Sequence, residues 1–445
     1  RPSVAPSTDH PTQHTVELTR SGIILTIIMW RHAVVASAAV PAAMAPSHIV
    51  ESIIPPDNDQ LVLKHVQVVF RHGARTPISS LYGFEGTFPT PSGVNFSCRG
   101  PVSPLFFAEA KRLYHKNYSP SLKHSDNISR GVPGWCRPGQ LTVQGRRDLR
   151  KVGSVLHQRY VEETGFLDSE FNPKKVTVRS TDVERTMESA VSLLEVLFAA
   201  KTLIPAITIN TLKESDENMY PRSSCRSLKL LKSAAINHLV KERQQDRDTL
   251  TQEIREAFKV SHAGAIARFE GLHNTSRCYL ANSVPLPHPL SNELAERIEK
   301  EAIQEMQAKY GSIAIVRLGI GRFLGDVIHD LETSTRSEIK LRLYSGHDNT
   351  VGPLLIALES DPVSGAVGKL QEFPGFGSHI TLELYQEKGS ERFWVRGLYS
   401  GRNHDLNLPG SQANRNGRVL VQLEDLSRRL SPLIPDGLAY EEECR

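Results

Sequence analysis

Three parts of the chain share one order: a short run of apolar and β-branched residues, a polar turn, and then apolar residues at helical spacing. The runs are residues 61–70, 175–178 and 339–344. Short β-branched runs of this kind predict buried strands. Because strands joined by crossover helices form parallel sheets, the pattern predicts an α/β fold. We expect a doubly wound, mostly parallel sheet with helices on both faces and a smaller, mostly helical cap.

Apolar residues at helical spacing predict the layers that cover this sheet. A helix over 142–160 fits between the first two strands, and a helix over 314–332 fits before the third. After the second strand, Ser180, Thr181 or Asp182 can cap a further helix, with Glu184 in its first turn. Residues 353–358 begin another apolar helix after the third strand.

Two polar segments interrupt the pattern within a domain that we expect to span 61–445. Residues 79–140 are rich in Pro, Gly and Ser, and residues 213–290 are polar, with 233–260 typical of an exposed helix. We interpret both segments as loops and cap insertions over the crevice at the sheet edge. The alternative is a helical insertion that has no part in substrate choice.

Residues 1–60 form a predicted N-terminal extension, either a targeting segment or a disordered one. No acidic residue occurs from 18 to 50, and the apolar run 22–30 is followed by Arg31. This run is too short to cross a bilayer. A signal peptide or anchor would use the apolar run, whereas a mitochondrial presequence would use the positive, acid-free character. No other segment resembles a transmembrane helix, so we expect no stable membrane span in the mature domain.

Charge and cysteine usage exclude some classes of protein. Among 445 residues, Lys plus Arg is 53 and Asp plus Glu is 49, so the net charge of +4 gives no sign of a nucleic-acid partner. Five cysteines without a CxxC pair argue against a zinc ribbon; they allow one or two disulfides of unknown pairing and leave at least one free thiol. N-x-S/T matches at Asn95, Asn117, Asn127 and Asn274 are either glycosylation sites or chance matches.

The polar turns that follow the three predicted strands carry the candidate chemistry. They are residues 71–77, 179–182 and 345–348. Because parallel strands present their carboxyl ends at one edge of the sheet, we expect the three turns to meet in one crevice. Arg71, Arg75 and Arg179 are then placed to bind phosphate oxygens, since guanidinium groups match these oxygens in pairs and stay charged.

His72 and Asp348 complete a possible phosphoryl-transfer site. Flanking arginines lower the pKa of a histidine, so the His72 imidazole can stay neutral and nucleophilic in acid. Asp348, next to His347, is the candidate proton donor for the leaving alkoxide, which predicts activity at mildly acidic pH. The sequence shows no cluster of metal ligands, and we predict no metal and no cofactor.

These residues resemble the signatures of the histidine acid phosphatases. Residues 71–77, Arg-His-Gly-Ala-Arg-Thr-Pro, are similar to the RHGxRxP motif, and His347-Asp348 is similar to the HD motif. Residues 139–145, 178–186 and 380–386 also resemble blocks of this family, and the resemblance runs from about 61 to 399. Residues 63–70, 171–173 and 220–225 are similar to the lysophosphatidic acid phosphatases within it, whereas 79–140 are not.

The resemblance implies a role for each matching residue. His72 would be the phosphorylated nucleophile, Arg71, Arg75, Arg179 and His347 would bind the phosphoryl group, and Asp348 would protonate the leaving group and later activate water. The expected partner is a small phosphate monoester, with lysophosphatidic acid as the implied substrate and the mitochondrion as the implied location; the secretory pathway is the alternative. A phytase of the same superfamily and a non-catalytic phosphate-binding protein are the competing interpretations. The oligomeric state stays open.

Overall fold

The computed structural model describes residues 60–80, 89–90, 93–98, 136–198, 208–259, 268–400 and 405–445. The predicted N-terminal extension and most of the predicted insertion at 79–140 lie outside these residues. Within the described part of the chain, no helix combines the length and the apolar character needed to cross a membrane.

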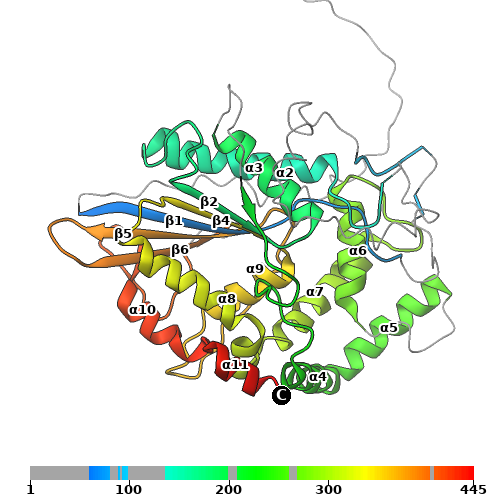
Figure 1. The fold of residues 1–445 in the computed structure, drawn as a ribbon. Coiled ribbons are helices and arrows are strands. Elements are labelled where there is room, and N and C mark those ends of the chain that lie inside the picture. Colours follow the sequence, from blue (N-terminus) through cyan, green and yellow to red (C-terminus); the bar gives the residue numbers. More distant parts are fainter. Residues whose placement is uncertain are drawn as a thin grey trace, which may run out of the picture. The chain divides into compact units, whose positions relative to one another are not determined.

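In the part of the chain that the structure describes, one eight-stranded sheet organises the fold (Figure 1). Its strand order is β3-β2-β4-β1-β5-β6-β8-β7, and β1, β2, β3 and β4 run parallel to one another. The remaining strands pair antiparallel, starting with β5 against β1. The strands are β1 (Leu61–Arg71), β2 (Val176–Ser180), β3 (Ile209–Asn210), β4 (Leu341–Gly346), β5 (His379–Glu387), β6 (Phe393–Tyr399), β7 (Gln412–Ala413) and β8 (Val419–Gln422).

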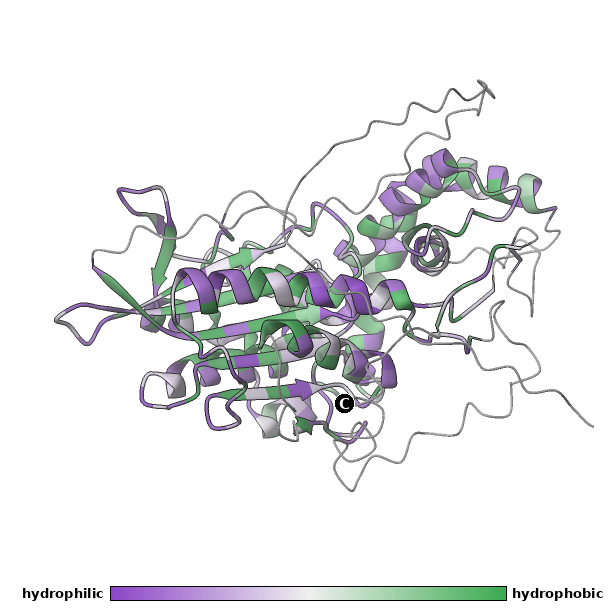
Figure 2. Ribbon diagram, turned by 90° about the horizontal axis from the view of Figure 1, so that it is seen from above, coloured by the Kyte–Doolittle hydropathy of each residue, from purple (hydrophilic) through white to green (hydrophobic). Residues whose placement is uncertain are grey.

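Helices cover both faces of this sheet, and each face has its own apolar core. On one face, α2 (Val143–His157), its π-helical extension η3 (Gln158–Glu163) and α3 (Glu184–Leu197) pack on alternate residues of β1, β2 and β4. On the other face lie α8 (Ile313–Ser334), α9 (Asp348–Leu358), α10 (Leu423–Leu430) and α11 (Gly437–Glu443), with the short 3-10 turn Ser431–Leu433 between the last two. Figure 2 shows hydrophobic residues concentrated along the central strands.

A helical cap lies beyond the carboxyl ends of β1, β2 and β4. It consists of α4 (Arg226–Glu242), α5 (Gln244–Phe258), α6 (Phe269–Ala281) and α7 (Asn292–Ala308). Apolar residues of α5, α6 and α7 form a third core with Phe96 and the disulfide Cys98–Cys136. A second disulfide, Cys225–Cys444, joins the start of α4 to the end of α11. The cysteine that stays free is Cys278, which is buried.

The predicted α/β fold with helices on both faces is confirmed, and the three predicted strands are β1, β2 and β4. One detail of β2 differs from the expectation: the strand runs through Ser180, two residues beyond the predicted end. In the second half of the sheet, the five-residue connection between β5 and β6 is too short for a crossover helix, so these strands pair antiparallel.

Candidate active site

The turn that follows β1 is fixed by its own backbone. The N–H of His72 donates to the Gly346 carbonyl at the end of β4 (3.0 Å). The N–H of Gly73 donates to Ser189 Oγ on α3 (3.2 Å), and that of Ala74 to Asp148 Oδ2 on α2 (3.1 Å). Three successive backbone N–H groups of this short turn therefore donate to acceptors on one strand and two helices. These hydrogen bonds fix the backbone of the turn and so the positions of its side chains.

Close packing explains the glycine in this turn. A Cβ atom on Gly73 would stand 2.1 Å from the Gly145 carbonyl oxygen of α2. The reverse also holds, because a Cβ on Gly145 would stand 2.1 Å from the Ala74 carbonyl oxygen. The turn and the first turn of α2 touch through backbone alone, and no larger residue fits at either position.

His72 lies at the centre of the cluster with one ring nitrogen already engaged. Its Nδ1–H donates to the Gly73 carbonyl (2.8 Å), which leaves Nε2 as the nitrogen with a free lone pair. Burial, followed by the positive charges of Arg185 and Arg71, holds the pKa of His72 well below its usual range. The imidazole is therefore neutral even in acid, as a nucleophile requires.

Arg71, the last residue of β1, is 2% exposed and makes contacts on every side. Its Nη2 pairs with Asp348 Oδ2 (2.8 Å) and also donates to Asn274 Oδ1 on the cap helix α6 (3.0 Å). Nη1 donates to the Pro374 carbonyl. The Phe376 ring covers one face of the guanidinium at 4.4 Å, so the plane of the group is fixed as well as its position.

His347 and Asp348 stand where β4 ends and α9 begins. The Thr350 backbone N–H donates to the His347 carbonyl (3.1 Å), while the Thr350 side chain accepts from the His347 N–H (3.1 Å), which fixes the first turn of α9. His347 Nε2 lies 3.0 Å from Thr181 Oγ1, and its ring centroid lies 5.5 Å from that of His72. Burial, with Arg185 next, lowers the pKa of His347 far below its usual range.

Two further arginines complete the positive charge of the cluster. Arg75 donates from Nη1 to the Thr76 carbonyl (2.9 Å) and to Cys278 Sγ on α6 (3.2 Å). Arg185, in the first turn of α3, reaches His347 Nδ1 with Nη2 at 3.4 Å. Burial and the nearby charge of Arg75 lower the Arg185 pKa to about 9, although Asp348 opposes this. The cluster thus contains three guanidiniums and one carboxylate, which pairs with Arg71, so its net charge is positive.

A match to a protein family explains this arrangement. The model of the histidine phosphatase superfamily (branch 2) matches residues 62–400, which include every residue of the cluster. The chain belongs to this superfamily.

Proteins of similar sequence include acid phosphatases, which is consistent with this family match. The chain is 30% identical over 324 residues to a probable acid phosphatase of Dictyostelium discoideum, covering 68% of this chain and 63% of that protein. It is 29% identical over 368 residues to the lysophosphatidic acid phosphatase type 6 of Mus musculus, covering 78% and 81%. The chain therefore spans less than two thirds of the first of these relatives.

One of the solved structures with the same fold as this histidine phosphatase is a phytase from Klebsiella sp. ASR1. The TM-score is 0.58 at 14% identity, and the match covers 86% of this chain and 97% of that one. At this identity the likeness concerns the fold, which is that of the histidine acid phosphatases and phytases.

Of the six site residues that we predicted from the sequence, the structure brings five together: Arg71, His72, Arg75, His347 and Asp348. Arg179 is not in the cluster, so its predicted place is wrong. Because β2 continues to Ser180, Arg179 lies inside the strand and projects to the face covered by α8. There it pairs with Asp326 (2.8 Å) and with Glu217 (3.0 Å).

Sequence reasoning missed three residues of the site. Arg185 lay within a segment that resembles the family, but it follows no strand end and begins a helix instead. Asn274 and Cys278 come from α6 of the cap, far from the motifs in sequence. No spacing rule links a residue of α6 to Arg71, so only the fold could reveal these contacts. The contact of Asn274 with Arg71 also makes this N-x-S/T match a part of the site rather than a surface acceptor.

The described residues offer no group of three or more His, Cys, Asp or Glu side chains that could hold a metal ion. What the cluster offers is a neutral imidazole with a free nitrogen, three guanidiniums and a carboxyl group. This set fits a phosphate oxyanion at its centre.

Proposed function

We propose that this histidine phosphatase hydrolyses phosphate monoesters through a phosphohistidine intermediate on His72. The arrangement of Arg71, Arg75 and Arg185 around the free Nε2 of His72 carries the proposal. Phosphoryl transfer depends mainly on positioning and on charge stabilisation, and three fixed guanidiniums supply both. The superfamily match and the acid phosphatases among the relatives support the same activity.

In the first step, Nε2 of His72 attacks phosphorus opposite the leaving oxygen. The bond between phosphorus and nitrogen forms while the ester P–O bond breaks. The three arginines hold the equatorial oxygens and balance their negative charge, and His347 lies beside them as a neutral imidazole. Since the Nδ1–H of His72 stays bonded to the Gly73 carbonyl, the positive charge that develops on the imidazole is partly stabilised by that oxygen.

The leaving alkoxide needs a proton, and Asp348 is placed to deliver it. Burial raises the pKa of this carboxyl group, but Arg71 and Arg75 outweigh burial, and the pKa lies below its ordinary value. Asp348 is therefore a carboxylate in the unliganded enzyme. A bound phosphate offsets the charge of the arginines, which weakens their pull on Asp348. A substrate monoanion can also carry the proton in with it, and monoesters are monoanionic below a pH of about 6.

In the second step, water attacks the phosphohistidine. Asp348, now a carboxylate again, takes a proton from the water as its oxygen bonds to phosphorus and the P–N bond breaks. Phosphate leaves and His72 returns to its neutral form. These two reaction steps need no chemical group beyond the side chains of this protein and water.

A lysophosphatidic acid is the substrate that we favour. Aromatic side chains flank the cluster: Phe376 lies over Arg71, and the Tyr220 ring lies 6.0 Å from that of His347. Such neighbours suit an ester with an apolar part, and the mouse relative is named for lysophosphatidic acid. The alternative is an inositol phosphate, which the phytase fold supports. A turnover screen over lysophosphatidic acid, phytate and sugar phosphates separates the two.

For the location, the two disulfides bear on the alternatives that the sequence left open. Cys98–Cys136 and Cys225–Cys444 form readily in an oxidising compartment and not in a reducing one. They support the secretory pathway more than the mitochondrial matrix. Localising the tagged full-length protein tests this point.

The test of the catalytic proposal is the His72→Ala variant. We expect the wild-type protein to hydrolyse p-nitrophenyl phosphate in mild acid and to yield an acid-labile phosphoenzyme on rapid quenching. The variant should lose both, with an unchanged circular dichroism spectrum as the control for folding. A phosphoenzyme that persists in the variant would place the nucleophile elsewhere. Phosphate binding without turnover by the wild-type protein would favour the non-catalytic alternative.

A further inference from the structure

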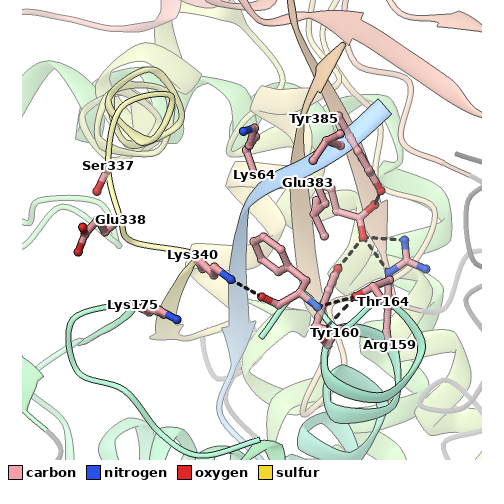
Figure 3. A pocket seen from close by; sticks show the side chains of 14 residues that line it. Lys64, Arg159, Tyr160, Thr164, Lys175, Ser337, Glu338, Lys340, Glu383 and Tyr385 are labelled. Atoms are coloured by element: carbon pink, nitrogen blue, oxygen red, sulfur yellow. Dashed lines mark hydrogen bonds and ion pairs between the residues drawn. The ribbon is translucent and has the colours of Figure 1, made fainter. Parts of the chain in front are cut away.

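A cavity lies at the opposite end of the parallel strands from the His72 cluster. It has a volume of about 690 Å³, within the usual range for small-molecule sites. We call it the lysine pocket (Figure 3); it is lined by Val62, Leu63, Lys64, Arg159, Tyr160, Thr164, Gly165, Phe166, Lys175, Ser337, Glu338, Lys340, Glu383 and Tyr385. None of these residues belongs to the active site described above.

Two lysines stand side by side in this pocket. Lys175 precedes β2 and Lys340 precedes β4, and the Lys340 N–H donates to the Lys175 carbonyl (2.8 Å). In Figure 3 both ammonium groups point to the same side, toward Tyr160, whereas the Glu338 carboxylate points away from them. Like charges on neighbouring strands repel each other, so this arrangement costs stability unless an anion lies between them.

The acidic groups nearby balance the charge of these two lysines only in part. Glu383 is fully buried and is committed to Arg159, Tyr160 and Tyr385, at 2.6 to 2.8 Å. Asp168 pairs with Lys175 (2.8 Å), and the charge of Lys340 also acts on this carboxylate. Asp168 is half exposed and lies outside the lining, however, and exposed pairs of this kind are weak. A third cation, Lys64, also belongs to the lining.

The remaining wall of the pocket is apolar and aromatic. The Phe166 ring lies under Lys340, with Nζ 5.2 Å from its centroid, and the same Nζ donates to the Phe166 carbonyl (2.8 Å). Val62 lines the cavity and is 42% exposed. The hydroxyl groups of Tyr160 and Tyr385 are both bonded to Glu383, so these two residues offer their rings rather than their polar ends.

We propose that the lysine pocket binds an amphiphilic organic anion. Its phosphate or carboxylate head lies between Lys175 and Lys340, and its apolar chain or ring packs against Phe166 and Val62. The head relieves the repulsion of the two ammonium groups with charge-assisted hydrogen bonds, for which Lys340 still has two free donors. The chain covers apolar surface that is otherwise in contact with water.

Isothermal titration of the full chain with hexylphosphonate at about pH 8, where lysines stay charged, tests the proposal. The carbon–phosphorus bond is not an ester, so the probe is not consumed. We expect two binding sites in the wild-type protein. In Lys175→Gln/Lys340→Gln, one site should weaken by about tenfold or more, the effect of losing charge-assisted hydrogen bonds. Lys174→Gln is the matched control, since Lys174 is exposed and outside the lining.

Two further measurements test which part of the ligand the lysine pocket recognises. Methylphosphonate carries the same head without the chain and should bind this site more weakly than hexylphosphonate does. The Phe166→Ala variant removes the aromatic wall and should weaken hexylphosphonate binding at this site only. Inhibition of p-nitrophenyl phosphate hydrolysis by hexylphosphonate reports the active site, and its inhibition constant should be the same in all of these variants. Since the titration needs no turnover, it also stands if the proposed phosphatase activity fails. A single site in the wild-type protein, a second site that is indifferent to both lysines, or equal affinity for methylphosphonate would overturn the proposal.

Discussion

Arg179 and Arg185 are six positions apart, yet the structure gives them different surroundings. Arg179 is held by Asp326, Glu217 and Asn218 on the α8 side of the sheet, whereas Arg185 stands beside His347. The same substitution at the two positions should therefore have two different consequences.

We expect Arg185→Ala to lower kcat for p-nitrophenyl phosphate by about 10²–10³-fold, as for the loss of one preorganised donor in a site of this kind. Arg179→Ala should leave kcat nearly unchanged and lower the free energy of unfolding by about 2 kcal/mol, because Glu217 is buried and loses a charged partner. Steady-state rates and urea unfolding of both variants measure this. The reverse pattern would restore Arg179 to the site.

The proton-donor role of Asp348 predicts a dependence on the leaving group. Asp348→Asn cannot supply a proton, so hydrolysis of an alkyl phosphate should slow by about 10²–10⁴-fold. p-Nitrophenyl phosphate should suffer far less, since its phenolate leaves without a proton. Comparison of kcat for the two substrates measures the difference, and equal losses would remove Asp348 from this role.

The sequence predicted five of the gathered residues because each lies at a strand end or just after it, and strand ends can be located from the apolar pattern. It failed at Arg179 because β2 continues to Ser180, which places Arg179 inside the strand and not in the turn after it. Successive side chains of a strand alternate between the two faces, so Arg179 lies on the face opposite to Val178 and away from the cluster. The position of Arg185 depends on where α3 begins, and the first residue of a helix is harder to locate from the sequence than the end of a strand.

Among the elements, the turn after β1 is defined by its contact with α2 and α3. Gly73→Ala would force a Cβ into the Gly145 carbonyl, and no flexible side chain there can move aside. We expect a loss of about 3 kcal/mol in stability, typical of overpacking, together with a lower kcat. Gly271→Ala on α6 is the control, because its Cβ would meet nothing within 4 Å and alanine favours helix. Thermal unfolding compares the two, and a fully stable Gly73→Ala would contradict the packing argument.

The elements that the sequence predicted are those with a strong apolar period. The helix expected over 314–332 is α8, and the one over 142–160 is α2 with its π-helical extension. The limits of the cap were harder to predict. Its last helix, α7, ends at Ala308, beyond the predicted end at residue 290. Their apolar residues pack against one another and against the segment around Cys98, which is a tertiary arrangement that local periodicity does not reveal.

For the whole molecule, buried histidines set the response to acid. Among the described residues, burial lowers the pKa of five histidines: to about 4 for His65 and His379, and well below the usual range for His72, His273 and His347. Between pH 6.5 and about 4 the unfolded chain binds these protons and the folded chain does not. Stability therefore falls as pH falls through this range.

Two buried carboxyl groups oppose this trend in the same range. Burial raises the pKa of Asp148 to about 6 and raises that of Glu188, so the folded state binds their protons first and gains stability as pH falls. Because five histidines outnumber two carboxyls, we expect urea unfolding to show a net loss of stability from pH 7 to pH 5. A free energy of unfolding that stays constant or rises over this range would contradict the assignment of neutral buried histidines.

The hydrogen bonds from α6 to the cluster constrain how the enzyme can be redesigned. Asn274 and Cys278 belong to the cap, yet they contact the guanidiniums of Arg71 and Arg75. A chimera that took its cap from another phosphatase would replace these acceptors along with any specificity determinants. Exchange of the cap would thus alter the chemistry as well as the choice of substrate, unless the donor helix offers equivalent oxygen and sulfur atoms at the same two places.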